Sequence, residues 1–146
     1  MSQSIVDFLI RAKQATYAGK GSETTASRTN SHDLMYQDGD LTYYDTYLGS
    51  DRFMGEEALW IKDKPYWGMN YAGRALSEEF TTDFLREALR IIPPESPFRG
   101  PARYSKGDHV YTCSVEGTFD WFRGKETVSF KGKEVYECYF HGGLIE

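Results

Sequence analysis

The sequence predicts an α+β fold in which a helix followed by a three-stranded antiparallel meander occurs twice. Two observations lead to this fold class. Helical periodicity is found in two segments, and each is followed by three runs in which polar and apolar residues alternate. The halves also share a frame, because residues 53–73 align without a gap to residues 122–142 through F-x-G-x-E, K-x-K and a closing glycine. We therefore expect a pseudo-two-fold arrangement with helices packed on antiparallel sheet and a cleft between the halves.

A single domain is expected over residues 1–146, because a chain of 146 residues has the length of one ordinary domain. Within it, repeat one would span about residues 4–73 and repeat two about residues 77–143.

The first element is a helix predicted over Ser4–Tyr17. Apolar residues share one face of it at helical spacing, namely Ile5, Phe8, Leu9 and Ala12. Gly19 and Gly21 end the helix. The polar stretch that follows, up to His32, has no periodicity and is long for a connection. It is expected to be either a binding loop or a mobile one.

The first meander is predicted from three alternating runs at Leu41–Leu48, Arg52–Lys62 and Pro65–Ala72. A short extra strand near Leu34–Gln37 would precede them across the Asp38-Gly39 turn.

The second helix is predicted after Ser77 and is stopped by Pro93 and Pro94. Its apolar face would consist of Phe80, Phe84, Leu85, Ala88, Leu89 and Ile92. The second meander would follow at His109–Glu116, Trp121–Lys131 and Glu134–His141.

Two glutamates occupy matched positions on the expected inner face of the strands. In residues 122–131 one set of alternating residues is polar throughout and must face water, so the other set faces inward. Glu126 belongs to the inward set, and the same register places Glu57 inward. An inward carboxylate is costly unless it is paired or hydrogen-bonded, and perturbed carboxylates in clefts are candidates for function. In the structural alternative, each glutamate accepts hydrogen bonds from a tyrosine or an amide and only maintains the architecture.

The rest of the expected inner surface is aromatic with one further acid. Extending the alternation to the neighbouring strands gives these candidate ligand-binding residues: Glu57, Glu126, Asp45, Tyr43, Trp67, Tyr71, Tyr111 and Tyr136. Aromatic walls with carboxylates suit an aromatic or cationic small molecule. The first hypothesis is therefore a sensor-like binding domain rather than an enzyme.

Two other functions stay open at this stage. A small hydrolase could use Glu57 and Glu126 as paired carboxylates, which would then be the catalytic residues. A protein-interaction module would instead bind a partner through an exposed aromatic patch.

Composition limits the partners. The net charge of −5 argues against direct contact with nucleic acid, which needs a basic surface. No apolar run is long enough to span a membrane, and the N-terminus does not resemble a signal peptide. We expect a cytoplasmic protein with reduced Cys113 and Cys138, a small-molecule ligand and no cofactor. Association into a homodimer stays open.

No metal site is expected. His109, Cys113, Cys138 and His141 have the right chemistry for zinc. However, Cys138 and His141 are three residues apart in a strand and so point to opposite faces.

Four motifs carry a resemblance that covers nearly the whole chain: D-G-D-L-x-Y-x-D-T-Y-L-G, F-x-G-E-E-A-L-W, Y-W-x-M-N-Y-x-G-R and V-Y-E-C-x-F-H-G-G. With them the chain resembles a small bacterial family known only as a domain of unknown function. In that family the domain also follows Cro/repressor-type helix-turn-helix domains, which implies a sensing or partner-binding role in a transcription-regulator-associated domain. A weaker architectural likeness is to GyrI-like ligand-binding domains, in which a buried glutamate meets cationic aromatic ligands. Glu57 or Glu126 would be its counterpart here.

Overall fold

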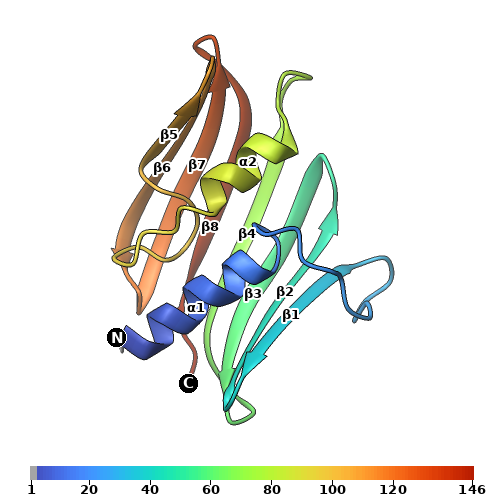
Figure 1. Cartoon of the computed structure of the whole chain (residues 1–146), viewed down its shortest axis with the longest axis vertical. Helices are drawn as coiled ribbons and strands as arrows, with labels where there is room; N and C mark the ends of the chain where they lie inside the picture. The colour runs from blue at the N-terminus through green and yellow to red at the C-terminus, as the bar shows by residue number, and fades with distance from the viewer. Residues whose placement is uncertain (1–2) are drawn as a thin grey trace.

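The computed structural model describes residues 3–146 as one eight-stranded antiparallel sheet with two short helices (Figure 1). The helices are α1 (Gln3–Ala15) and α2 (Thr82–Leu89). The strands are β1 (His32–Asp38), β2 (Leu41–Gly49), β3 (Arg52–Ile61), β4 (Lys64–Ala75), β5 (Arg103–Lys106), β6 (His109–Thr118), β7 (Trp121–Phe130) and β8 (Lys133–Leu144). Their order across the sheet is β1-β2-β3-β4-β8-β7-β6-β5.

The predicted fold class is wrong. The molecule is mostly one antiparallel sheet of eight strands, not two helix-plus-three-stranded-meander repeats in α+β packing. Two pairings produce this difference. The backbone edges of β4 and β8 bond to each other over Trp67–Ala75 and Tyr136–Leu144, which merges all the strands into one sheet. In addition, residues 103–106 pair as the outermost strand β5 instead of serving only as a connection. The extra strand predicted near Leu34–Gln37 is confirmed as β1 at the other edge.

The predicted inward register within the strands is confirmed. Leu59, Trp67, Val128 and Tyr136 are fully buried, whereas Arg123, from the polar set, is exposed. The six strands expected in the meanders each lie within three residues of the predicted ends. The second helix is shorter than predicted, because it begins at Thr82, where the Thr81 side chain accepts a hydrogen bond from the Phe84 amide.

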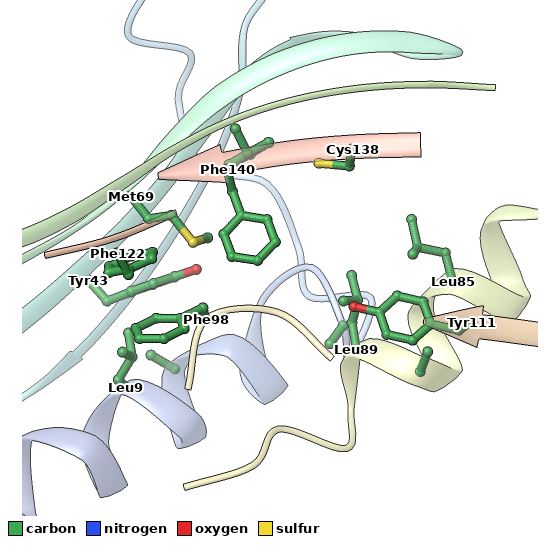
Figure 2. Packing of buried hydrophobic residues seen from close by; sticks show 14 of the residues in the cluster. Leu9, Tyr43, Met69, Leu85, Leu89, Phe98, Tyr111, Phe122, Cys138 and Phe140 are labelled. Atoms are coloured by element: carbon green, nitrogen blue, oxygen red, sulfur yellow. The ribbon is translucent and has the colours of Figure 1, made fainter. Parts of the chain in front are cut away.

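Both helices lie across the same face of the sheet, and the main core lies between them and that face (Figure 1). The loop after α2 also enters this core. Figure 2 shows Phe98 from that loop next to Leu9 of α1 and close to Tyr43 and Phe122 of the sheet. The rings of Phe98 and Phe122 stack with their centroids 3.8 Å apart. The covered face of the sheet is therefore where side chains distant in sequence meet.

The polar connection between α1 and β1 is attached to the sheet edge. Thr24 forms an isolated antiparallel bridge with Asp33. The buried Asp33 carboxylate accepts hydrogen bonds from the Ser31 hydroxyl at 2.6 Å and the Thr46 hydroxyl at 2.9 Å. Burial disfavours this charge, but the hydroxyl donors and the amide of Ser27 outweigh it and lower the pKa of Asp33.

Neither helix within residues 3–146 has the length and apolar character needed to cross a membrane.

Candidate functional site

Five acidic or basic residues lie buried between the helices and the sheet, and we call them the buried charge layer. They are Lys13 (7% exposed), Asp45 (3%), Glu57 (4%), Arg99 (8%) and Glu126 (0%). Charged side chains are seldom buried unless they are paired. The pairing within this layer therefore decides which of the groups are available to a ligand.

Glu126 is completely engaged by protein donors. Arg99 binds it through two parallel hydrogen bonds, Nε to Oε1 at 3.0 Å and Nη2 to Oε2 at 2.6 Å. Tyr111 donates to Oε1 at 2.6 Å and Tyr136 to Oε2 at 2.7 Å. Burial acts to raise the pKa of Glu126, but the Arg99 charge and these hydrogen bonds outweigh burial, so its pKa is lowered.

Glu57 is paired with a lysine from the first helix. Lys13 Nζ donates to Glu57 Oε1 and also to the carbonyl oxygen of Phe98, the latter at 2.8 Å. The Tyr43 hydroxyl donates to the same Oε1 at 2.6 Å. The other oxygen, Oε2, lies 4.0 Å from Arg99 Nη1. The two ion pairs are therefore neighbours in one network.

Arg99 reaches the interior because of the path of the loop between α2 and β5. Phe98 packs into the core, and Gly100 donates its amide to the Tyr111 hydroxyl at 2.9 Å. A Cβ atom at position 100 would lie 2.7 Å from the Tyr111 ring, so only glycine permits this approach. These two contacts hold Arg99 over the sheet, opposite Glu126.

Asp45 has no cation of its own. Its register partner on β3 is Glu57, and its one hydrogen-bond donor among residues 3–146 is the Tyr71 hydroxyl, 2.5 Å from Oδ1. Gly55 leaves room for this contact, because a Cβ atom there would be 2.6 Å from the Tyr71 oxygen. Burial, followed by the charge of Glu57, raises the pKa of Asp45 to about 7.

A cavity of about 250 Å³ lies beside the first-half part of this layer. Its walls come from α1, α2, the Phe98–Arg99 loop and strands β2, β3 and β4. The aromatic lining residues are Tyr17, Tyr43, Tyr47, Phe53, Tyr71, Phe80 and Phe98. Ser50, Asp51 and Thr82 also line it and are exposed. The cavity therefore opens to solvent between the β2–β3 turn and the start of α2.

The structure brings half of the sequence-predicted ligand-binding residues to this cavity. Those that line it are Tyr43, Asp45, Glu57 and Tyr71, whereas Trp67, Tyr111, Glu126 and Tyr136 are not among its lining residues. Trp67 is fully buried and donates its indole N–H to the carbonyl oxygen of Phe119 at 3.1 Å. Tyr111 and Tyr136 are occupied with Glu126. These two hydrogen bonds are those expected if Glu126 only maintains the architecture by accepting hydrogen bonds from tyrosines.

Sequence reasoning missed the two cations of the layer. Arg99 lies in a loop, where arginines are usually solvated, but it is buried against Glu126. Lys13 carried a usable signal, since Ile5, Leu9 and Lys13 are four residues apart and share one helix face. A lysine continuing an apolar stripe indicates a buried acidic partner. Nothing comparable in the sequence marks Arg99.

The residues considered for zinc do not form a metal site. No group of three or more histidine, cysteine or acidic side chains in residues 3–146 is placed to hold a metal ion. Cys138 is buried and His141 is exposed, as expected for opposite faces of β8. Both cysteines are free thiols, and burial raises the pKa of Cys113 to about 11 and that of Cys138 to about 12.

Comparison with known proteins identifies a family for the chain but no function. No curated protein and no solved structure matches it. Residues 45–145, which include β3, β4 and the whole second half, match the family described as Domain of unknown function (DUF5680), and the chain belongs to that family.

Proposed function

We propose that this protein is a binding domain for a small aromatic or cationic molecule, and that the ligand occupies the cavity between the helices and the first half of the sheet. The observation that carries the proposal is the cavity itself. It is lined by aromatic rings, opens at one end and contains a buried carboxyl group that lacks a protein cation. Concave, mostly apolar sites with a few polar groups are typical of small-molecule binding.

The arrangement of the glutamates favours binding over hydrolysis. Paired carboxylate chemistry needs one acid and one base that both reach the substrate. Glu126 accepts hydrogen bonds from Arg99, Tyr111 and Tyr136 and is fully buried. Neither member of the hypothetical catalytic pair is therefore free of a protein cation, since Glu57 is bound by Lys13.

A sensing role is part of the proposal. It is supported by the resemblance to bacterial domains that follow Cro/repressor-type helix-turn-helix units. Two free thiols are consistent with the proposed cytoplasmic location. In this view ligand binding would be transmitted to a partner, whether a fused domain or a second copy of the chain.

A thermal-shift screen tests the proposal. The purified protein would be heated with amines, nucleosides, drug-like aromatic compounds and divalent metals. A ligand present at about a hundred times its dissociation constant adds roughly 2.7 kcal/mol of stability, which raises the melting temperature measurably. We expect hits among aromatic and cationic compounds.

A matched pair of variants assigns such hits to the cavity. Thr82 is exposed and lines the cavity, so Thr82→Trp places an indole at its opening. Thr118 is exposed at the end of β6 and is not a lining residue, so Thr118→Trp is the control. The hits should weaken in Thr82→Trp and persist in Thr118→Trp. Equal shifts in both variants would place binding elsewhere and refute the proposal.

A further inference from the structure

Within the buried charge layer one carboxyl group is left without a counter-charge. Lys13 neutralises Glu57, and Arg99 neutralises Glu126. Two cations thus serve two of the three carboxyl groups, and no lysine, arginine or histidine nitrogen in residues 3–146 lies within ion-pair distance of Asp45. Below pH 7 a proton on Asp45 balances the layer, because burial and the charge of Glu57 raise the pKa of this group to about 7.

The geometry of Asp45 leaves one oxygen directed at open space. Oδ1 accepts the hydrogen bond from Tyr71, and no donor in residues 3–146 reaches Oδ2. Every fully buried polar side-chain atom in this part of the chain has a hydrogen-bond partner. Oδ2 must therefore border a space, and the cavity that Asp45 lines is that space.

We propose that Asp45 selects the ligand, and that the ligand is a protonated amine on an aromatic or apolar body that fits the cavity. This inference rests on the proposed function, because it names the ligand class of the same cavity. The ammonium group would donate to Asp45 Oδ2, while the aromatic walls, including Tyr47, Phe53 and Phe80, would contact the body of the molecule. Its positive charge would supply the counter-charge that the layer lacks.

Binding of a cation would displace the Asp45 proton into solvent. The ionisable groups that face Asp45 are Glu57 on β3, Tyr71 on β4, Lys13 on α1, Arg99 in the loop after α2, and Tyr17, Tyr43 and Tyr47 nearby. Arg86 of α2, His32 of β1 and Asp51 of the β2–β3 turn line the same cavity. Lys13 and Arg99 are already engaged by glutamates, so the proton on Asp45 is the positive charge that a ligand can replace.

This exchange predicts a particular pH dependence. An amine resembling the lysine side chain, with a pKa of about 10, stays charged from pH 5 to 8. Its affinity should be highest above pH 7, where Asp45 is ionised, and should fall as the pH decreases. A neutral molecule of the same shape should bind with little dependence on pH.

The experiment compares matched probes in the full chain by calorimetry and by NMR titration. The probes are 2-phenylethylamine with 2-phenylethanol, and tryptamine with its alcohol analogue tryptophol. At pH 8 we expect each amine to bind about tenfold more tightly than its alcohol or better, as charge-assisted hydrogen bonds allow. At pH 6 amine binding should release a proton, so its measured enthalpy should vary with the ionisation enthalpy of the buffer.

Two variants distinguish selection of the amine by Asp45 from a general electrostatic attraction of amines to an acidic protein. Asp45→Asn keeps the shape and should abolish the amine preference while leaving alcohol binding nearly unchanged. Asp108→Asn makes the same chemical change at an exposed residue that does not line the cavity and should keep the preference.

The outcomes distinguish the two proposals. If the wild type binds amine and alcohol equally, or if the preference survives in Asp45→Asn, the inference is overturned and the cavity proposal stands. If neither probe pair binds but the screen gives other hits that Thr82→Trp weakens, the inference is overturned and the cavity proposal stands. If the screen gives no such hit, both proposals fail. Proton release from the wild type provides a readout that does not depend on any variant folding.

Discussion

At the scale of single residues, Glu126 shows how a buried charge is made tolerable. Its two oxygens accept four hydrogen bonds, two from Arg99 and one each from Tyr111 and Tyr136. Removing the charge at this position would leave the Arg99 guanidinium in the core without its anion.

The first prediction is therefore that Glu126→Gln is strongly destabilising. Breaking one partner of a buried ion pair typically costs about 3–5 kcal/mol, and this loss should appear as a lower free energy of unfolding in urea. Glu116→Gln is the matched control, since Glu116 pairs with Arg123 at the surface with 73% of its side chain exposed. Exposed pairs contribute about 0–1 kcal/mol. Equal effects of the two changes would contradict the role assigned to Glu126.

The second prediction concerns pH and Asp45. Its folded-state pKa of about 7 lies above the ordinary value of 3.8, so the folded protein binds this proton more tightly than the unfolded chain. The contribution to stability is fully present below pH 3.8 and is lost as the pH rises through 7. Asp45→Asn has no ionisable group at this position, so its stability does not fall in this way as the pH rises. Between pH 5 and 8 the variant should gain about 1–3 kcal/mol relative to the wild type.

Urea unfolding of both proteins at several pH values measures this difference, and Asp51→Asn serves as the exposed control. If the difference in free energy of unfolding between the wild type and Asp45→Asn stays constant across the range, the carboxyl group is not protonated in the folded state.

At this scale the sequence predicted which face of the sheet a carboxylate occupies better than it predicted which cation the carboxylate pairs with. Strand alternation correctly placed Glu57 and Glu126 on the inner face, because side-chain direction has a strict period of two. It could not show that Lys13 and Arg99 would meet them, since those contacts join residues 44 and 27 positions apart. These ion pairs depend on tertiary packing. They distinguish the two glutamates, which each have a cation, from Asp45, which has none within ion-pair distance.

At the scale of elements, one contact links α1 to the sheet electrostatically. Lys13 lies in the last turn of α1 and donates both to Glu57 on β3 and to the Phe98 carbonyl in the loop after α2. One side chain thus joins a helix, a strand and a loop that are distant in sequence.

The third prediction is a non-additive effect at this junction. Lys13→Met leaves Glu57 buried without its lysine and should cost about 3–5 kcal/mol. Glu57→Gln alone should also be destabilising. The double variant should recover much of the loss, because neither charge remains unpaired. A double-mutant cycle measured by urea unfolding tests this, and additive losses would show that the pair does not couple α1 to β3.

Element prediction succeeded where local patterns decide and failed where distant pairing decides. The strand boundaries follow alternation and turn residues, so β2, β3, β6 and β7 all start at the predicted residue. Residues 103–106 carry too short a pattern to indicate a strand, and they become β5 only by pairing with β6. The association of β4 with β8 likewise has no local signature, and this pairing is the reason that the predicted fold class was wrong.

At the scale of the whole molecule, the β4–β8 pairing joins the two halves of the chain. These are the longest strands, with 12 residues each, and they pair continuously from Trp67–Leu144 to Ala75–Tyr136. Both helices and the buried loop cover the same face of the sheet. The Arg99 side chain further links the halves, since it binds Glu126 on β7 and lies 4.0 Å from Glu57 on β3.

The fourth prediction is that the sheet unfolds as one cooperative unit, with its most protected amides at this central pairing. Opening β4 from β8 exposes the core beneath both strands and disturbs the charge layer, so it should require nearly global unfolding. The outermost strands β1 and β5 can open at lower cost, because each has one neighbour. Native-state hydrogen exchange should therefore give the highest opening free energies at β4 and β8 and the lowest at β5. If β4–β8 amides instead exchange faster than those of the β2–β3 and β6–β7 pairs, the halves open independently, and a ligand in the first-half cavity could not influence the second half through the sheet.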